Sequence, residues 1–200
     1  MLKRTHTGFS LIELIVGLAI LGLLMALGVP QYATFISNSR LRATAEGVAN
    51  GLNLARAEAV KRNARVELAF TDDEPLEAMV NAMAASTSGV NWVVREWVPS
   101  TNSYNFIEGK SGAEGSGRSD SSGVLITPVT GGAYDGTTTF TGFGALNTAQ
   151  SISFQVTYPS AGLCAAAGGP LRCLNVNVSP GGQIRICDPN VTAANDTRAC

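Results

Sequence analysis

Residues 8–30 read Gly-Phe-Ser-Leu-Ile-Glu-Leu-Ile-Val-Gly-Leu-Ala-Ile-Leu-Gly-Leu-Leu-Met-Ala-Leu-Gly-Val-Pro, and this stretch decides the fold. Within residues 9–29 the only polar side chains are those of Ser10 and Glu13. A helix of this length rises about 30 Å, which matches the hydrocarbon core of a bilayer. The stretch therefore predicts a helix that spans a membrane.

A short basic leader with Lys3 and Arg4 precedes this apolar run. A secretory signal has an apolar core of about 7–15 residues followed by a small residue at the cleavage site. Here the small residue, Gly8, stands before the apolar run, which is also longer. We therefore expect the run to be retained. Because basic residues stay on the cytoplasmic side, the part of the chain after the helix is expected to lie on the opposite side of the membrane.

Glu13 is an ionisable residue inside the apolar run. Such a residue costs roughly 2.5–3.5 kcal/mol on membrane-insertion scales and marks a functional position by default. Either its carboxylate reaches back to the lipid headgroups, or it pairs with a specific cationic partner. The cost favours the second interpretation.

A helical pattern resumes after Pro30, with apolar residues at alternating spacings of four and three. They are Leu41, Ala45, Val48, Leu52, Ala55 and Ala59. This predicts one long helix to Arg62, with Pro30, Gly47 and Gly51 as candidate bend points. Basic residues outnumber acidic ones here, but no aromatic residues interleave with them, so a solvated face is favoured over a polyanion-binding stripe.

Beyond the helix the apolar period becomes two, which is typical of half-buried strands. Expected strands are 65–70, 92–98, 104–108, 123–129, 137–143, 151–158, 174–179 and 183–187. Short strands at this spacing predict packed antiparallel sheets, and the chain therefore falls in the α+β class. We expect a short helical insertion within 71–88 and a flexible loop over 109–123.

The composition argues against catalysis. His6 is the only histidine, the formal net charge is −1 and only 14% of residues are charged. These values disfavour a histidine-based triad or metal site and a chain-wide nucleic-acid footprint. Asp72 and its acidic neighbours fit an exposed turn. Trp92 and Trp97 lie five apart, on opposite faces of a strand, so at least one belongs to the core. No enzyme activity, cofactor or metal is expected.

The segment Gly8-Phe9-Ser10-Leu11-Ile12-Glu13 resembles the processing site of type IV pilins and type II secretion pseudopilins. In those proteins a prepilin peptidase cuts after the glycine and methylates the new amino terminus. The resemblance implies cleavage between Gly8 and Phe9. The positively charged amine exposed on Phe9 would then form an ion pair with Glu13 of a neighbouring subunit, so that the two buried charges neutralise each other.

The remaining chain resembles the GspH/FimT-type minor pilins. The segments that carry the resemblance are 51–62, 92–97, 139–144 and 176–187. The resemblance implies a long N-terminal helix packed against two antiparallel sheets. The expected organisation is a leader at 1–8, a transmembrane helix at 9–29, the soluble half of the helix at 30–62 and a β-rich pilin domain at 63–200.

Four cysteines lie in the last 37 residues: Cys164, Cys173, Cys187 and Cys200. They are expected outside the cytoplasm, where disulfides form, and their number allows three connectivities. Sequential pairing would close two short loops and tie down the chain terminus. A zinc site is disfavoured because no Cys-x-x-Cys pair is present.

The resemblance implies a minor pilin of a type IV pilus that helps to initiate or cap assembly. Its implied partners are a prepilin peptidase, other minor and major pilins and the inner membrane, with the soluble domain in the periplasm and then in the pilus. The ending from Cys187 to Cys200 looks more like the FimT/FimU pilus proteins than the secretion pseudopilins, which stay the alternative.

A second alternative is a pilus-associated DNA receptor for natural transformation. Some FimT-type members carry a Gly-Arg-x-Arg motif near the C terminus, and the matching residues here are Gly182, Gln183, Ile184 and Arg185. Only the second arginine of the motif is present. Arg172 and Arg198 are the other candidates for phosphate contact, and three arginines predict weak, salt-sensitive binding.

Overall fold

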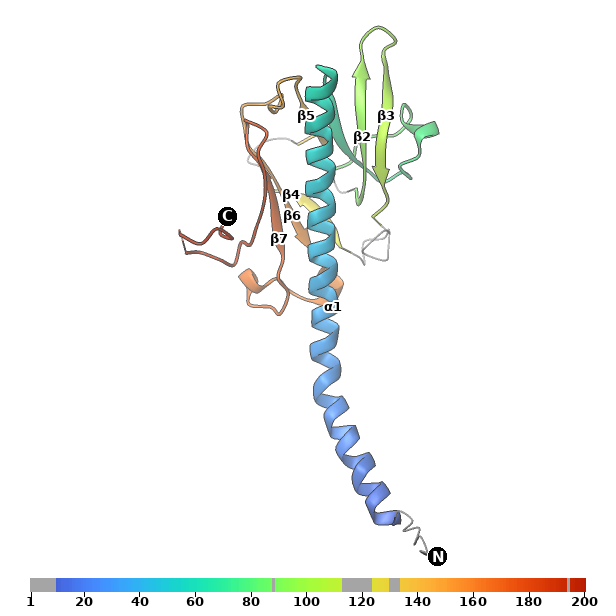
Figure 1. Cartoon of the computed structure of the whole chain (residues 1–200), viewed down its shortest axis with the longest axis vertical. Coiled ribbons are helices and arrows are strands. Elements are labelled where there is room, and N and C mark those ends of the chain that lie inside the picture. The colour runs from blue at the N-terminus through green and yellow to red at the C-terminus, as the bar shows by residue number, and fades with distance from the viewer. Residues whose placement is uncertain (1–9, 88, 113–123, 130–133, 194) are drawn as a thin grey trace, which may run out of the picture. The chain divides into compact units, whose positions relative to one another are not determined.

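The computed structural model describes residues 10–87, 89–112, 124–129, 134–193 and 195–200, and within these it leaves the side chains of 27–30 aside. The chain divides into two compact units, 1–36 and 37–200. The helix α1 (Leu11–Arg62) begins in the first unit and ends in the second, and it is followed by the strands (Figure 1).

In the first unit, α1 turns its apolar side chains outward on all sides. The large apolar residues from Leu11 to Met25 are between 49% and 78% exposed, and Tyr32 and Phe35 are exposed as well. A helix that is apolar all round needs an apolar environment, because soluble proteins rarely expose a continuous apolar patch of this extent. By length and composition, α1 is able to cross a membrane.

In the second unit, the predicted apolar stripe of α1 is buried. Its members Leu41, Ala45, Val48, Leu52, Ala55 and Ala59 are each at most 1% exposed. Gly51 lies on the same side, and a Cβ atom there would come within 2.9 Å of Leu68 and Trp92. The missing side chain therefore lets the helix approach the sheet closely.

The C-terminal end of α1 is closed by a Schellman motif. Asn63 adopts a positive φ of 50°, and its backbone N–H donates to the carbonyl of Val60. The next N–H, of Ala64, donates to the carbonyl of Ala59. Asparagine tolerates this left-handed conformation better than most residues, which places the helix end at Arg62 as the sequence predicted.

The first sheet has the strand order β3-β2-β1-β5, and all its neighbours are antiparallel. Its strands are β1 (Val66–Thr71), β2 (Asn91–Val98), β3 (Ser103–Lys110) and β5 (Thr137–Phe140). The register places Leu68 opposite Val94, and both are fully buried under α1. A one-turn 3₁₀ helix, η1 (Glu77–Met79), lies in the predicted insertion between β1 and β2.

The second sheet has the strand order β4-β6-β7-β8 and is also antiparallel. Its strands are β4 (Leu125–Pro128), β6 (Ile152–Thr157), β7 (Leu174–Val178) and β8 (Ile184–Cys187). Between β6 and β7 lie the 3₁₀ turns η2 (Pro159–Ala161) and η3 (Ala165–Ala167). Buried residues of both sheets, such as Phe70 and Phe154, join the α1 stripe in one core. In Figure 1 the second half of α1 runs in front of both sheets.

These elements confirm the predicted α+β fold of a long helix and two antiparallel sheets. The predicted strand 137–143 ends early, at Phe140, because the chain turns back and the N–H of Thr141 donates to the carbonyl of Ala145. The predicted loop 109–123 begins later than expected, since β3 continues to Lys110. Residues 113–123 of that loop lie outside the described residues.

Two disulfides join the cysteines in sequential pairs. Cys164 is bonded to Cys173 and Cys187 to Cys200, with Cα–Cα distances of 5.4 and 5.1 Å. The second bond ties the chain end to the end of β8. A closed loop of about 15 residues stabilises a fold by roughly 3 kcal/mol in the chain-entropy account.

Candidate assembly and processing site

The first turn of α1 carries the candidate assembly residue Glu13. The backbone N–H of Ser10 donates to Glu13 Oε2 at 3.3 Å, and the N–H of Glu13 donates back to Ser10 Oγ at 3.3 Å. This reciprocal pair is a capping box, in which two otherwise unpaired helix N–H groups find acceptors. The processing residues Gly8 and Phe9 lie outside the described residues.

The capping box is a feature that the sequence reasoning missed. Its signal is the Ser-x-x-Glu spacing of Ser10 and Glu13 at the start of a helix. The bonds of 3.3 Å are long for N–H···O contacts, and a carboxylate has about four acceptor positions. Glu13 is also exposed, so its carboxylate can still accept hydrogen bonds from a cation while it caps its own helix.

Three basic side chains of α1 hold the helix to the β-rich part of the second unit. Arg40 Nη1 donates to the hydroxyl of Tyr158 at 3.0 Å, and Arg56 Nε donates to the carbonyl of Gly144 at 3.0 Å. Arg62 Nη1 lies 2.7 Å from Glu96 on β2. The basic face of the helix is therefore partly an internal contact and not simply the solvated face that the sequence favoured.

Glu58 lies at the centre of the last basic cluster of α1. It accepts from Lys61 at 2.9 Å and from Arg62 at 2.7 Å. These two hydrogen bonds hold the pKa of the Glu58 carboxyl below its ordinary value. The same carboxylate, with a weaker contribution from Glu96, raises the pKa of Arg62. Glu58 and Arg62, four residues apart on α1, thus form an ion pair.

Arg185 of β8 contacts the C-terminal disulfide loop on both sides of Arg198. Arg185 Nη2 donates to the carbonyl of Thr197 at 2.8 Å and to that of Ala199, one residue on either side of Arg198. Arg198 forms two side-chain hydrogen bonds with Asp196, which lower the pKa of that carboxyl to about 2. Both guanidinium groups therefore already have partners in the loop.

The third candidate, Arg172, belongs to the other disulfide loop. Its backbone N–H donates to Asn38 Oδ1 of α1 at 2.7 Å. The structure thus places Arg185 against the backbone that flanks Arg198, and it places Arg172 in a different disulfide loop. Because phosphate affinity depends on several free positive charges in one patch, DNA binding by these arginines stays a prediction.

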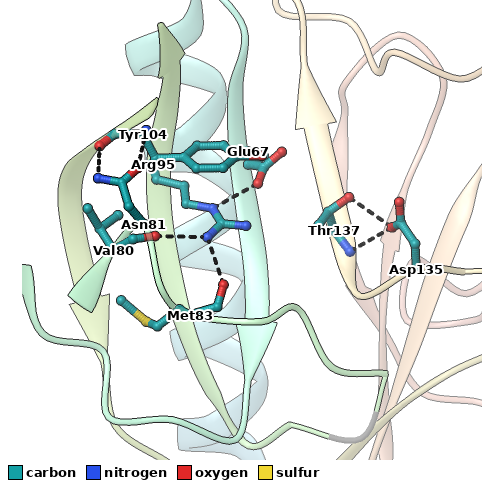
Figure 2. A network of polar contacts seen from close by, with 8 residues as sticks. All are labelled: Glu67, Val80, Asn81, Met83, Arg95, Tyr104, Asp135 and Thr137. Carbon is teal, nitrogen blue, oxygen red and sulfur yellow. Dashed lines mark hydrogen bonds and ion pairs between the residues drawn. The ribbon is translucent and has the colours of Figure 1, made fainter. Parts of the chain in front are cut away.

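A buried ion pair lies on the face of the first sheet that points away from α1. Arg95 Nε is 2.8 Å from Glu67 Oε1, with side chains 6% and 11% exposed. Arg95 Nη1 also donates to the carbonyls of Val80 and Met83, so it holds the insertion after β1 against the sheet (Figure 2). Breaking one partner of such a pair leaves a buried charge and is strongly destabilising.

The described residues contain no group of three or more histidine, cysteine, aspartate or glutamate side chains placed to hold a metal ion. Asp72 and Asp73 follow β1 as exposed residues. Asp73 contributes its backbone N–H to the hydroxyl of Thr71 and its carbonyl to Asn91, which are the contacts of a turn.

A long helix with an outward apolar half, joined to two antiparallel sheets, defines a pilin-like class of protein. A solved structure, the type IV minor pilin FimU of Pseudomonas aeruginosa, resembles this chain with a TM-score of 0.51 at 18% identity, over 76% of this chain and 91% of that one. The minor pseudopilin EpsH of the Vibrio cholerae type 2 secretion system aligns with a TM-score of 0.48 at 8% identity, over 76% and 99%.

The particular family follows from sequence comparison. The family described as type II transport protein GspH matches residues 44–182, and the prokaryotic N-terminal methylation motif matches residues 3–29. The fimbrial protein EcpC of Eikenella corrodens is 30% identical over 118 residues, which cover 56% of this chain and 74% of that protein. The chain belongs to the GspH family of minor pilins and pseudopilins.

Family membership also sets the general partners. The N-terminal methylation motif implies processing by a prepilin peptidase, and a pilin or pseudopilin implies other pilins as neighbours. With its apolar helix, the chain fits a precursor anchored in a membrane.

Proposed function

We propose that this chain is a minor pilin of a type IV pilus that helps to initiate or cap filament assembly. The observation that carries the proposal is the contrast along α1: an outward apolar half headed by Glu13, and a second half sealed into a domain. A subunit built this way keeps its folded domain while its apolar half passes from the membrane to contacts with neighbouring helices.

A pilus is favoured over a secretion pseudopilus by the relative EcpC, which is described as a fimbrial protein. The match covers 74% of EcpC at 30% identity. The family description refers to type II transport, so a secretion pseudopilin is the alternative that this proposal has to exclude. Purification of filaments from cells that carry a tagged chain separates the two.

In this proposal the chain is organised as a leader at 1–8, a transmembrane helix at 9–29, the soluble half of the helix at 30–62 and a pilin domain at 63–200. Cleavage occurs between Gly8 and Phe9, and the soluble part lies in the periplasm before it enters the pilus. The support is the glycine before the apolar run and the glutamate at the fifth position after the cut, four residues beyond Phe9.

Glu13 has the central role in assembly. The methylated amine of Phe9 on one subunit pairs with Glu13 of its neighbour, and in an apolar filament interior each charge lowers the cost of burying the other. The capping box keeps the carboxylate at the helix start until that amine arrives. Only a subunit that has been processed and is correctly positioned can form this ion pair between its Phe9 amine and the neighbour's Glu13.

The test compares Glu13→Gln with Ser10→Ala in the full-length chain. Glu13→Gln keeps an acceptor near the cap but removes the charge, so we expect normal processing and a strong loss from purified filaments. Ser10→Ala weakens the cap by about 1 kcal/mol but keeps the carboxylate, and we expect incorporation close to wild type. Immunoblots of filaments and membranes provide the measurement.

Mass spectrometry of the same samples tests processing. We expect a mature terminus at a methylated Phe9 in wild type and in both variants, and an unprocessed precursor for Gly8→Val. An intact Met1 in wild type, or Glu13→Gln incorporated as well as wild type, would contradict the proposal.

A further inference from the structure

A hollow of about 250 Å³ lies on the face of the first sheet that points away from α1. It is lined by Arg65, Glu67, Trp97, Tyr104, Thr139 and Asn147. The lining comes from the neighbouring strands β1, β2, β3 and β5 and the segments beside them. The register places Glu67 opposite both Arg95 and Thr139, and Trp97 opposite Tyr104.

The floor of the hollow is held rigidly by the buried ion pair. Arg95 lies 2.8 Å from Glu67 and also stacks on the ring of Tyr104, 3.9 Å from its centroid. Figure 2 shows the Arg95 guanidinium beside both the Glu67 carboxylate and the Tyr104 ring. Tyr104 in turn meets Trp97 edge to face, with ring centroids 4.9 Å apart. A ligand would therefore meet aromatic rings that are already in position.

The rim of the hollow carries polar side chains that can still form hydrogen bonds with a ligand. Among the residues that the structure describes, the side chains of Arg65, Thr139 and Asn147 and the indole N–H of Trp97 make no hydrogen bond or ion pair. Arg65 and Asn147 are exposed, and Trp97 and Thr139 are partly exposed. Since Arg95 balances Glu67, Arg65 leaves the site with one unpaired positive charge.

We propose that this hollow binds a saccharide unit that carries a carboxylate. A sugar ring has an apolar C–H face that can pack on an aromatic ring, and Trp97 and Tyr104 both line the hollow. Its hydroxyl groups both donate and accept hydrogen bonds. Asn147 and Thr139 offer donors and acceptors of matching kind. Arg65 offers a guanidinium fork, which matches the two oxygens of a carboxylate.

The size and polarity of the hollow favour this ligand over a protein partner. Sites for drug-sized ligands measure about 300–1,000 Å³, so this smaller hollow suits one sugar ring. The core of a protein interface is depleted of charged residues, whereas this lining contains Arg65 and Glu67. The inference does not depend on the role of the chain in a filament.

The test measures binding of glucuronic acid, glucose and acetate to the full-length chain in detergent. Saturation-transfer NMR and calorimetry report binding, and quenching of the partly exposed Trp97 against the buried Trp92 locates it. We expect glucuronic acid to bind about tenfold more tightly than glucose, because its carboxylate adds a charge-assisted hydrogen bond to Arg65. Acetate is expected to bind much more weakly.

Variants then assign the contacts. Arg65→Gln should weaken glucuronic acid about tenfold and leave glucose unchanged, and Asn147→Ala should weaken both. Arg42→Gln removes an exposed arginine of α1 outside the hollow and should change neither.

Three results would overturn the proposal. They are acetate binding as tightly as glucuronic acid, glucuronic acid binding that is indifferent to Arg65→Gln, and no saccharide signal at millimolar concentrations. Loss of Arg65→Gln from filaments together with absent saccharide binding would identify the face as a subunit contact instead. Because Glu13 lies in the first unit, failure of its assembly test would leave this result unaffected.

Discussion

Leu18 and Leu52 lie on the same helix, yet one is 60% exposed and the other is fully buried. This difference in exposure is typical of the two units of the molecule to which the two leucines belong. In the first unit the backbone hydrogen bonds and the cap of α1 are formed between residues close in sequence. Its large apolar side chains from Leu11 to Met25 are exposed and make no core. In the second unit the same helix is one layer of a core that it shares with two sheets.

A substitution in one half of α1 should therefore change a different property of the protein from a substitution in the other half. A change in the first half should alter membrane and filament contacts and leave the domain folded. A change in the second half should alter the free energy of unfolding, because its contacts are long-range and internal. Paired substitutions of the same residue type in the two halves test this division.

The largest effect is expected for Leu52→Ala. Removal of a fully buried leucine costs about 2–5 kcal/mol, depending on how far the cavity collapses. Leu18→Ala removes the same atoms from an exposed position, and surface substitutions usually stay within about 0.5 kcal/mol. Denaturant unfolding of the full chain in detergent, followed by the fluorescence of buried Trp92, gives both values. Equal losses for the two variants would remove the distinction between the units.

A smaller effect is expected at Gly51. An alanine Cβ would lie 2.9 Å from the side chains of Leu68 and Trp92, which are both buried in the core. Overpacking costs about 1–3 kcal/mol, and the gain in helix propensity offsets about 1 kcal/mol of it. Gly51→Ala should therefore lower the free energy of unfolding by about 1 kcal/mol.

Gly47→Ala is the matched control for that change. A Cβ at Gly47 meets only the flexible end of Lys110, at 3.5 Å. The variant keeps the propensity gain without the clash, so it should raise the free energy of unfolding by up to about 1 kcal/mol. If both alanines stabilise the chain equally, α1 does not approach the first sheet as closely as described.

Much of this fold is predictable because it rests on local periodicity. The spacing of Leu41 through Ala59 identifies the buried stripe of α1, and alternation identifies the strands. The separation of Trp92 from Trp97 predicts opposite faces of β2. The structure agrees, since Trp92 is buried in the core and Trp97 is partly exposed on the other face.

The order of the strands is not predictable in this way. β1 pairs with β5, whose residues follow about 70 positions later, and alternation carries no information on such partners. For the same reason Glu67 and Arg95 look like ordinary outward polar residues in the sequence. They are buried because the insertion after β1 folds over them, which requires knowledge of tertiary contacts.

The candidate sites also differ in whether they depend on local sequence or on tertiary contacts. Glu13 is recognisable because the processing motif is a continuous segment, and its capping partner Ser10 is visible at a spacing of three. The contacts of Arg185 with the carbonyls of Thr197 and Ala199 depend on how the C-terminal loop closes, so the sequence indicates an arginine there without showing that it is engaged.

The smallest expected effect concerns the pH dependence of the C-terminal loop. Hydrogen bonds from Arg198 lower the pKa of Asp196 to about 2, from an ordinary value of 3.8. A depressed carboxyl pKa means that the folded loop favours the charged form. Its contribution to loop order is therefore complete above the ordinary value and is lost as the pH falls from about 4 through 2.

Hydrogen exchange at the backbone N–H of Arg198, which donates to Asp196 Oδ1 at 2.9 Å, reports this contact directly. We expect its protection to decrease between about pH 4 and 2, after correction for the intrinsic exchange rate, while that of Val94 in the core of the first sheet stays constant. Asp196→Asn should remove the pH dependence and leave the Cys187–Cys200 bond intact. High salt should weaken the effect in wild type, because the pair is exposed and screened. Protection at Arg198 that is constant over this range would show that the disulfide and the Arg185 contacts order the loop, and the ion pair would then have no measurable part in it.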